Sequence, residues 1–255
     1  MKIIRFKTDG KISYGILNGD TIQPIEGEPY KDIKPAGVSY KLSDVKLLSP
    51  CVPSKIVAMG LNYRSHAEET RNPVPETPLI FLIPPTAVIG PEDNIVYPPS
   101  SKRVDYECEL AVVIKEKACR ISEEDSLRYV LGYTCLNDVT ARDLQTKDGQ
   151  WTRGKSFDTF APVGPCIETD LNLADVPVST WLNGECKQSG NTSDLIFSVP
   201  VIISFISHVM TLLPGDIIAT GTPSGIGPMQ PGDTVEVRIA PIGILKNYIV
   251  KQDIA

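Results

Sequence analysis

Short apolar runs rich in β-branched residues recur along this chain of 255 residues and restrict its possible folds more than any other feature. Runs of this length and composition are typical of buried strands. They read KIVAMG, PLIFLI, CELAVVIKEK, DIIATGT, TVEVRIA and ILKNYIVKQ. The runs do not alternate with helical segments, and 22 prolines and 19 glycines supply many turns between them. The pattern predicts a mainly β fold with a few helices and disfavours a doubly wound sheet.

Three segments carry helix signals. One follows Asn62. The next follows Ser122, which offers a cap and precedes an acidic first turn. The last begins near Ser198, where the proline at position 200 is tolerated in the first turn.

The first 50 residues differ in rhythm from the rest of the chain. They read as the short strands KIIRF, KISYGIL and DTIQPI, with the hairpin signal NGD before the third. The proline-bearing segment LLSPCVPSK then marks a change. We therefore predict a small β-rich N-terminal domain over residues 1–50 and a main, catalytic domain over residues 51–255.

The chain is acidic, with a formal net charge of -6 and a sequence pI of about 5.1. This balance disfavours nucleic acid and anionic membranes as partners, although a locally positive pocket still suits a small anion. The start MKIIRFKTDG lacks the pattern of a secretory signal, and no apolar run suits a membrane span. The 6 cysteines form no CxxC pair, which favours buried free thiols. We expect a cytoplasmic protein.

The run VDYECELAVV places acids inside a segment that otherwise reads as core. Side chains alternate along a strand, so Glu107 and Glu109 face the same side, with their Cα atoms roughly 6–7 Å apart. Two carboxylates so close repel, and one takes up a proton unless a cation lies between them. An exposed, solvated strand face is the alternative interpretation of this pair alone.

Three further segments carry groups suited to chemistry. LNDVTARD supplies Asp138 and Arg142, and WTRGKSFDTF supplies Lys155. LNYRSHAEE supplies His66 and Glu69, which one helical turn brings together. Each segment by itself is a weak signal, because a lone histidine or surface cation is more often structural.

Taken in order, the motifs NYRSHAEE, DYECEL, NDVTARDLQ, GKSFDT, ATGTPSGIG and PIGILKN resemble the fumarylacetoacetate hydrolase family. The resemblance runs from about residue 54 to residue 247. It implies a mixed β-roll or β-sandwich-like catalytic fold, a homodimer and a divalent metal, usually Mg²⁺, with Mn²⁺ or Ca²⁺ as alternatives. The shorter members that the chain resembles are acylpyruvases, oxaloacetate decarboxylases and homoprotocatechuate-pathway isomerase/decarboxylases.

Carried over by position, the resemblance implies a role for each motif residue. The implied metal ligands are Glu107, Glu109 and Asp138, an all-oxygen set that suits a hard cation. The implied catalytic residues are His66 and Glu69, which handle a water or a proton, and Lys155 beside the metal. The implied substrate-binding residues are Tyr63, Arg64, Arg142, Gln145 and Thr222.

The resemblance implies an enzyme that cleaves a C–C bond of a small anionic 2-oxo acid through an enolate held by the metal. Acylpyruvate hydrolysis and oxaloacetate-type decarboxylation both fit. Isomerisation of 2-hydroxyhepta-2,4-diene-1,7-dioate, with 5-oxopent-3-ene-1,2,5-tricarboxylate decarboxylation, is an alternative, and a non-catalytic carboxylate-binding protein is another. Three carboxylates with Mg²⁺ sum to -1, and Lys155 with Arg142 brings the sum to +1, which favours an anionic substrate.

Two residues have no role in this interpretation. Ile83 stands where many relatives have a lysine, and the loss of that cation puts binding of a second, distal carboxylate in doubt. Asp105 lies two residues before Glu107 on the same expected face, where it suits a supporting acid outside the ligand set.

Overall fold

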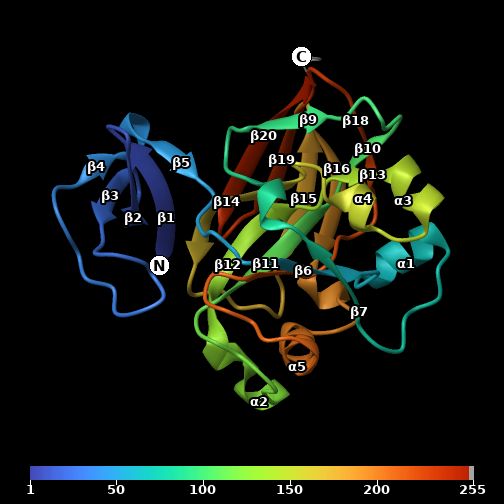
Figure 1. Ribbon diagram of the computed structural model, residues 1–255, viewed down its shortest axis with the longest axis horizontal. Helices are drawn as coiled ribbons and strands as arrows, with labels where there is room; N and C mark the ends of the chain where they lie inside the picture. The colour runs from blue at the N-terminus through green and yellow to red at the C-terminus, as the bar shows by residue number, and fades with distance from the viewer. Residues whose placement is uncertain (253–255) are drawn as a thin grey trace.

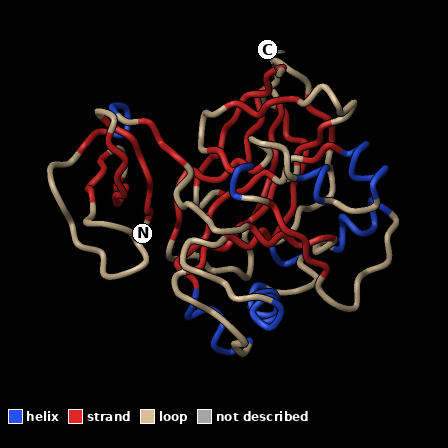
Figure 2. Tube along the Cα trace, viewed as in Figure 1, coloured by secondary structure: helices blue, strands red, loops and turns tan. Residues whose placement is uncertain are grey.

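The structure is a computed structural model that describes residues 1–252. Strands far outnumber helices in it, which confirms the mainly β class (Figure 2). In Figure 1 the first strands form a lobe at the left, beside a larger body that holds the remaining elements. No helix in the described part of the chain has the length and apolar character needed to cross a membrane.

The largest sheet has 12 strands and runs through both parts of the molecule. Its N-terminal strands are β1 (Lys2–Thr8), β2 (Lys11–Asn18), β3 (Thr21–Pro24), β4 (Tyr40–Lys41) and β5 (Lys46–Leu48). Its other strands are β6 (Ile56–Gly60), β7 (Leu79–Ile83), β8 (Val88–Ile89), β11 (Cys108–Ile114), β12 (Val130–Asn137), β14 (Ala161–Glu168) and β17 (Ile217–Ala219). The main order is β4-β3-β2-β1-β14-β12-β11-β17-β6-β7, which brings distant segments side by side.

Two smaller sheets and a few helices complete the fold. The five-stranded sheet contains β9 (Asn94–Tyr97), β15 (Pro177–Leu182), β16 (Glu185–Asn191), β19 (Thr234–Ile239) and β20 (Gly243–Lys251). The three-stranded sheet contains β10 (Val104–Tyr106), β13 (Thr140–Ala141) and β18 (Gly227–Met229). The α-helices are α1 (Arg64–Thr70), α2 (Glu123–Ser126), α3 (Arg142–Asp148), α4 (Thr152–Lys155) and α5 (Val199–Val209). Short 3-10 turns are η1 (Leu42–Asp44), η2 (Pro85–Ala87), η3 (Leu127–Tyr129) and η4 (Thr192–Asp194).

The N-terminal strands continue the sheet of the main body through an edge-strand pairing. β1 pairs antiparallel with β14, with Lys2 opposite Glu168 and Ile3 opposite Ile167. The boundary expected after residue 50 falls in the loop between β5 and β6. Because the hydrogen-bonded sheet continues across that boundary, the division into two domains stays a prediction.

Strand β11 lies at the centre of the main body and is buried along its whole length. Its even-numbered side chains, such as Leu110 and Val112, pack toward α5 and the five-stranded sheet. Its odd-numbered apolar side chains, Ala111 and Val113, pack with β6, β7, β14 and β17 on the other face. Burial on both faces explains why this strand reads as an unbroken apolar run beyond Glu109.

The three expected helices are present as α1, α2 and α5. Ser122 caps α2 by accepting a hydrogen bond from the backbone N–H of Asp125. The structure adds α3 and α4, and it adds four long strands, β12, β14, β15 and β16, that the apolar runs did not indicate. The interpretation of all six cysteines as buried is wrong for Cys119 and Cys186, which are exposed free thiols.

Candidate metal and active site

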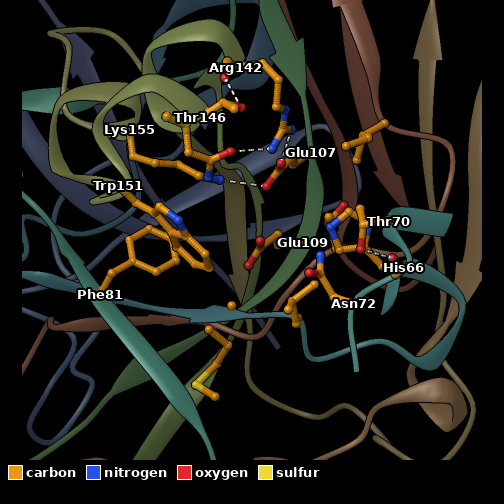
Figure 3. A pocket seen from close by; sticks show the side chains of 17 residues that line it. His66, Thr70, Asn72, Phe81, Glu107, Glu109, Arg142, Thr146, Trp151 and Lys155 are labelled. Atoms are coloured by element: carbon orange, nitrogen blue, oxygen red, sulfur yellow. Dashed lines mark hydrogen bonds and ion pairs between the residues drawn. The ribbon is translucent and has the colours of Figure 1, made fainter. Parts of the chain in front are cut away.

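A cavity of about 420 Å³ opens where the start of β11 meets α1, α3 and α4 (Figure 3). Acidic, basic and aromatic side chains face it together. Its lining comprises Met59, Gly60, Leu61, His66, Thr70, Asn72, Phe81, Glu107, Glu109, Arg142, Gln145, Thr146, Gly149, Trp151, Lys155, Thr222 and Ile226. In Figure 3, Phe81 and Trp151 lie on one side of Glu109, and His66, Thr70 and Asn72 lie on the other.

Glu107 and Glu109 reach this cavity from the start of β11. Glu107 itself falls in the break between β10 and β11, so the single strand expected over VDYECELAVV is two strands. The Asn137 side chain bridges the break by accepting a hydrogen bond from the Glu107 N–H at 2.9 Å. The expected common face of the two glutamates is confirmed, because both side chains line the cavity.

Asp138 completes a cluster of three buried carboxylates. It follows β12, which pairs with β11 so that Asn137 lies opposite Cys108. One oxygen each from Glu107, Glu109 and Asp138 lies within 4.8 Å of the others. Lys155 from α4 bridges two of them, donating to Glu107 Oε2 at 2.7 Å and to Asp138 Oδ2 at 2.6 Å.

The three carboxyl groups experience different electrostatic environments. Burial opposes the ionisation of Glu107, but Lys155 and Arg142 outweigh burial and lower its pKa to about 2. Burial raises the pKa of Asp138 to about 6, although Lys155 opposes that rise. Burial and then the charge of Asp138 raise the pKa of Glu109 well above its ordinary value. Within the described chain, Glu107 and Asp138 have ion-pair partners and Glu109 has none.

This donor set fits a hard divalent cation. All three donors are carboxylate oxygens, which are suitable ligands for Mg²⁺ and Mn²⁺. Among the described residues, buried Asp138 Oδ1 has no hydrogen-bond partner. Buried polar atoms are almost always paired, so an orphaned carboxylate oxygen beside two further acids indicates a ligand position.

His66 and Glu69 form a pair on α1. His66 Nδ1 lies 3.2 Å from Glu69 Oε2, and His66 is buried against the cavity. The other Glu69 oxygen accepts a hydrogen bond from the Gly225 N–H at 2.9 Å. With its Nδ1 proton donated to Glu69, the imidazole keeps Nε2 free to accept a proton.

Hydrogen bonds from side chains hold the segment that leads into α1 in place. Leu61 has a left-handed backbone with φ 50, and the buried Asn62 side chain donates to the Thr220 carbonyl at 2.8 Å. Asp194 accepts hydrogen bonds from both the N–H and the hydroxyl of Ser65, at 3.1 and 2.6 Å. These contacts fix the start of the helix and therefore the position of His66.

Three of the expected substrate-binding residues also line the cavity. Arg142 and Gln145 come from α3, where the guanidinium donates to Gln145 Oε1 at 2.7 Å. Thr222 is held by Gln188, whose amide donates to its hydroxyl at 2.9 Å. Their contact with a substrate stays a prediction.

Three other sequence positions lie away from the cavity. Tyr63 is fully buried in the core, and Arg64 is exposed; neither lines the cavity. Their expected role in substrate binding stays a prediction without support from this arrangement. Ile83 is also fully buried and packs in the core cluster of β6, β7 and β11.

Several cavity residues were not expected from the sequence. Phe81 and Trp151 form an edge-to-face pair with ring centroids 5.0 Å apart, and Thr70 and Asn72 lie near His66. One signal for Trp151 was present, because it stands four residues before Lys155, where a helical turn brings the two together. The others come from segments with no chemical signature.

Comparison with known families accounts for most of the chain. The model of the fumarylacetoacetate (FAA) hydrolase C-terminal domain matches residues 55–250. A model described as Rv2993c-like, N-terminal, matches residues 1–50.

Individual relatives share both sequence and fold. A mitochondrial oxaloacetate tautomerase of Rattus norvegicus is 41% identical over 220 residues, which cover 82% of this chain and 70% of that protein. The structure of 5-carboxymethyl-2-hydroxymuconate delta-isomerase from Mycobacterium smegmatis matches with a TM-score of 0.94 and 41% identity, covering 99% of this chain and 100% of that one. Maleylpyruvate hydrolase from Sphingobium sp. SYK-6, in complex with manganese (II) ion and pyruvate, matches with a TM-score of 0.83 and 31% identity, covering 99% and 100%.

Proposed function

The chain belongs to the fumarylacetoacetate hydrolase family, and on this premise we propose that it is a divalent-metal-dependent enzyme acting on a small 2-oxo acid. The reaction that we propose is cleavage of the C3–C4 bond, either by hydrolysis of an acylpyruvate or by decarboxylation of an oxaloacetate-type acid. The observation that carries this proposal is one cavity lined by Glu107, Glu109 and His66, with Asp138 completing the carboxylate cluster and Glu69 paired with His66.

Glu107, Glu109 and Asp138 would hold the cation, and Mg²⁺ or Mn²⁺ suits them. The related maleylpyruvate hydrolase was solved with manganese and pyruvate, which supports this assignment. When bound, the cation supplies Lewis-acid stabilisation of the negative charge that develops on the 2-oxo oxygen. Lys155 adds a fixed positive charge between Glu107 and Asp138.

In hydrolysis, His66 acts as the general base. Glu69 holds Nδ1, and Nε2 takes a proton from a water molecule whose oxygen attacks the C4 carbonyl carbon. The C3–C4 bond then breaks, and its electron pair passes to C3, which takes up the proton held by His66 to give pyruvate and a second carboxylic acid. In decarboxylation the same bond releases CO₂, and no attacking water is needed.

Isomerisation or tautomerisation is the second candidate. The tautomerase and isomerase named above support it, since each is 41% identical to this chain over the compared residues. Here His66 would move a proton between carbon and oxygen positions of a 2-oxo acid, and no C–C bond would break. A purely carboxylate-binding protein has less support, because binding alone gives no reason for a base oriented by Glu69.

A substrate panel tests the proposal. Acetylpyruvate, fumarylpyruvate, oxaloacetate and 2-hydroxyhepta-2,4-diene-1,7-dioate would each be offered with Mg²⁺, with Mn²⁺ and with EDTA. We expect metal-dependent pyruvate release from at least one, and we expect Glu109→Gln to abolish it because two carboxylates hold Mg²⁺ poorly. Decay of enol or diene absorbance without pyruvate would favour the second candidate. Turnover unaffected by EDTA would contradict the metal assignment.

The homodimer and the cytoplasmic location are parts of the proposal that rest on the family resemblance and the composition. Light scattering on the purified chain measures the first, and localisation of a tagged chain measures the second.

A further inference from the structure

Six charged side chains of alternating sign form a continuous chain of contacts that ends in the candidate metal site. Arg103 Nε donates to Asp105 Oδ1 at 2.8 Å, and Arg142 Nε donates to Asp105 Oδ2 at 2.9 Å. Arg142 Nη2 then donates to Glu107 Oε1. Lys155 continues the chain from Glu107 to Asp138. We call these six residues the charge chain.

The charge chain runs from solvent into the interior. The Arg103 side chain is 49% exposed, whereas Arg142 is 19% exposed and Asp105 is completely buried. A fully buried carboxylate is costly unless it is paired, and both Asp105 oxygens have a cationic donor. Asp105 lies outside the group of three carboxylates whose oxygens are close enough together to share a metal ion.

Asp105 fixes the orientation of the Arg142 guanidinium. The planar group donates in three directions, with Nε to Asp105, Nη1 to Gln145 and Nη2 to Glu107. A rigid fork held at Nε has its other two nitrogens fixed in direction. The orientation of Glu107 is in turn fixed, because Arg142 engages one of its oxygens and Lys155 the other.

We propose that Asp105 is a positioning residue for the metal site, acting through Arg142 on the ligand Glu107, with Arg103 as its outer support. Residues that orient metal ligands in this way contribute to metal affinity without touching the ion. The inference rests on the proposed function, since it takes Glu107, Glu109 and Asp138 to bind a divalent cation. In this inference Arg142 orients the metal ligand Glu107, a role distinct from binding the substrate.

Mn²⁺ binding to the purified chain tests this inference directly. Isothermal titration gives the affinity, and the electron paramagnetic resonance spectrum of bound Mn²⁺ reports the symmetry of its ligands. We expect Asp105→Asn to weaken Mn²⁺ binding about 10–100-fold and to change the spectrum. Arg103→Gln should weaken it less, because water can replace an exposed arginine, and its effect should vanish when Asp105→Asn is already present.

Asp143→Asn is the matched control. Asp143 is the neighbour of Arg142 on α3 and accepts from the Ser101 hydroxyl at 2.6 Å, but it takes no part in the charge chain. It should leave both affinity and spectrum unchanged. Should Asp105→Asn fail to fold, Arg142→Lys carries the test, because one ammonium group cannot replace a fork that spans three acceptors.

The possible failures are distinguishable. Wild-type affinity and an unchanged spectrum in Asp105→Asn, or in Arg142→Lys if that variant carries the test, would overturn the inference while leaving the proposed function intact. A wild-type chain that does not bind Mn²⁺ would overturn the proposed function and this inference with it.

Discussion

Single residues in the carboxylate cluster differ in what balances their charge. Glu107 has Arg142 and Lys155 as ion-pair partners, whereas Glu109 accepts only from the Gly221 N–H, at 2.7 Å, among the contacts of the described chain. This contrast agrees with the opposite directions of their pKa shifts. Of the two glutamates, Glu109 has the greater need of a bound cation.

Replacing His66 should separate the candidate reactions. We expect His66→Ala to lower acylpyruvate hydrolysis about 10²–10⁴-fold, which is the usual contribution of a general base. Oxaloacetate decarboxylation should survive, because it needs no activated water. Pyruvate release from the two substrates, measured side by side with Mn²⁺ affinity, checks this.

Glu69→Gln serves as the companion variant, since it keeps the size of the side chain but removes the charge facing His66 Nδ1. It should lower hydrolysis in the same direction and leave Mn²⁺ affinity unchanged. If hydrolysis persists in both variants, another group activates the water.

The sequence and the family resemblance indicated part of the cavity lining, including His66, Glu107 and Glu109, but not the contacts between these residues. Strand parity placed Glu107 and Glu109 on one face, and helical spacing paired His66 with Glu69. Parity alone could not show that Arg142 holds Asp105 and Glu107 together, because α3 approaches β10 only in the folded chain.

At the scale of elements, one buried acid joins two parallel strands at their starts. Asp216 precedes β17 and is fully buried. It accepts from Ser54 Oγ at 2.6 Å, from the N–H groups of Ser54, Lys55 and Leu213, and from the Lys55 ammonium group. The segment that leads into β6 is thereby fastened to β17.

We expect Asp216→Ala to lower the free energy of unfolding by about 3–5 kcal/mol, because it leaves a partly buried ammonium and several N–H groups unpaired. Urea denaturation followed by tryptophan fluorescence measures the change. Glu185→Ala is the control, since Glu185 and its partner Lys187 are both exposed and such a surface pair contributes little to stability. Equal effects of the two variants would contradict the role of Asp216.

Several elements missed by the sequence interpretation lack the residue patterns that normally indicate a strand or a helix. β14 contains Pro162 and Pro165, and β12 contains Gly132, residues that normally weaken a strand assignment. A Cβ on Gly132 would lie 2.5 Å from the Glu168 carbonyl oxygen, so this glycine allows β12 and β14 to approach closely. α3 begins after Ala141, which offers no capping side chain. The spacing of apolar residues shows neither the close approach of β12 and β14 nor the start of α3.

Across the whole molecule, burial divides the six cysteines into two classes. Four are buried, and burial raises the pKa of Cys51 and of Cys108 to about 12. Cys119 and Cys186 are exposed. Reaction with a disulfide reagent depends on the thiolate and on access, so the two classes should react at different rates.

Native protein at pH 8 should therefore show 2 rapidly reacting thiols with 5,5′-dithiobis(2-nitrobenzoic acid), and denatured protein should show 6. The double variant Cys119→Ser with Cys186→Ser should show none in the fast phase. A fast phase of four or more thiols in the native protein would contradict the packing of β11 and β14 described above.

The two glutamates and the histidine of the site are positioned by different kinds of element. Glu107 and Glu109 come from the start of a central strand, and the removal of one residue between them would turn one carboxylate to the opposite face. His66 comes from a seven-residue helix flanked by loops, where changes of length are tolerated. The metal-binding strand is therefore constrained in length, whereas the loop over residues 73–78, beyond the contacts that fix α1, can change in length. A chain with this architecture can acquire a different reaction on the same class of substrate without rebuilding the part that binds the ion.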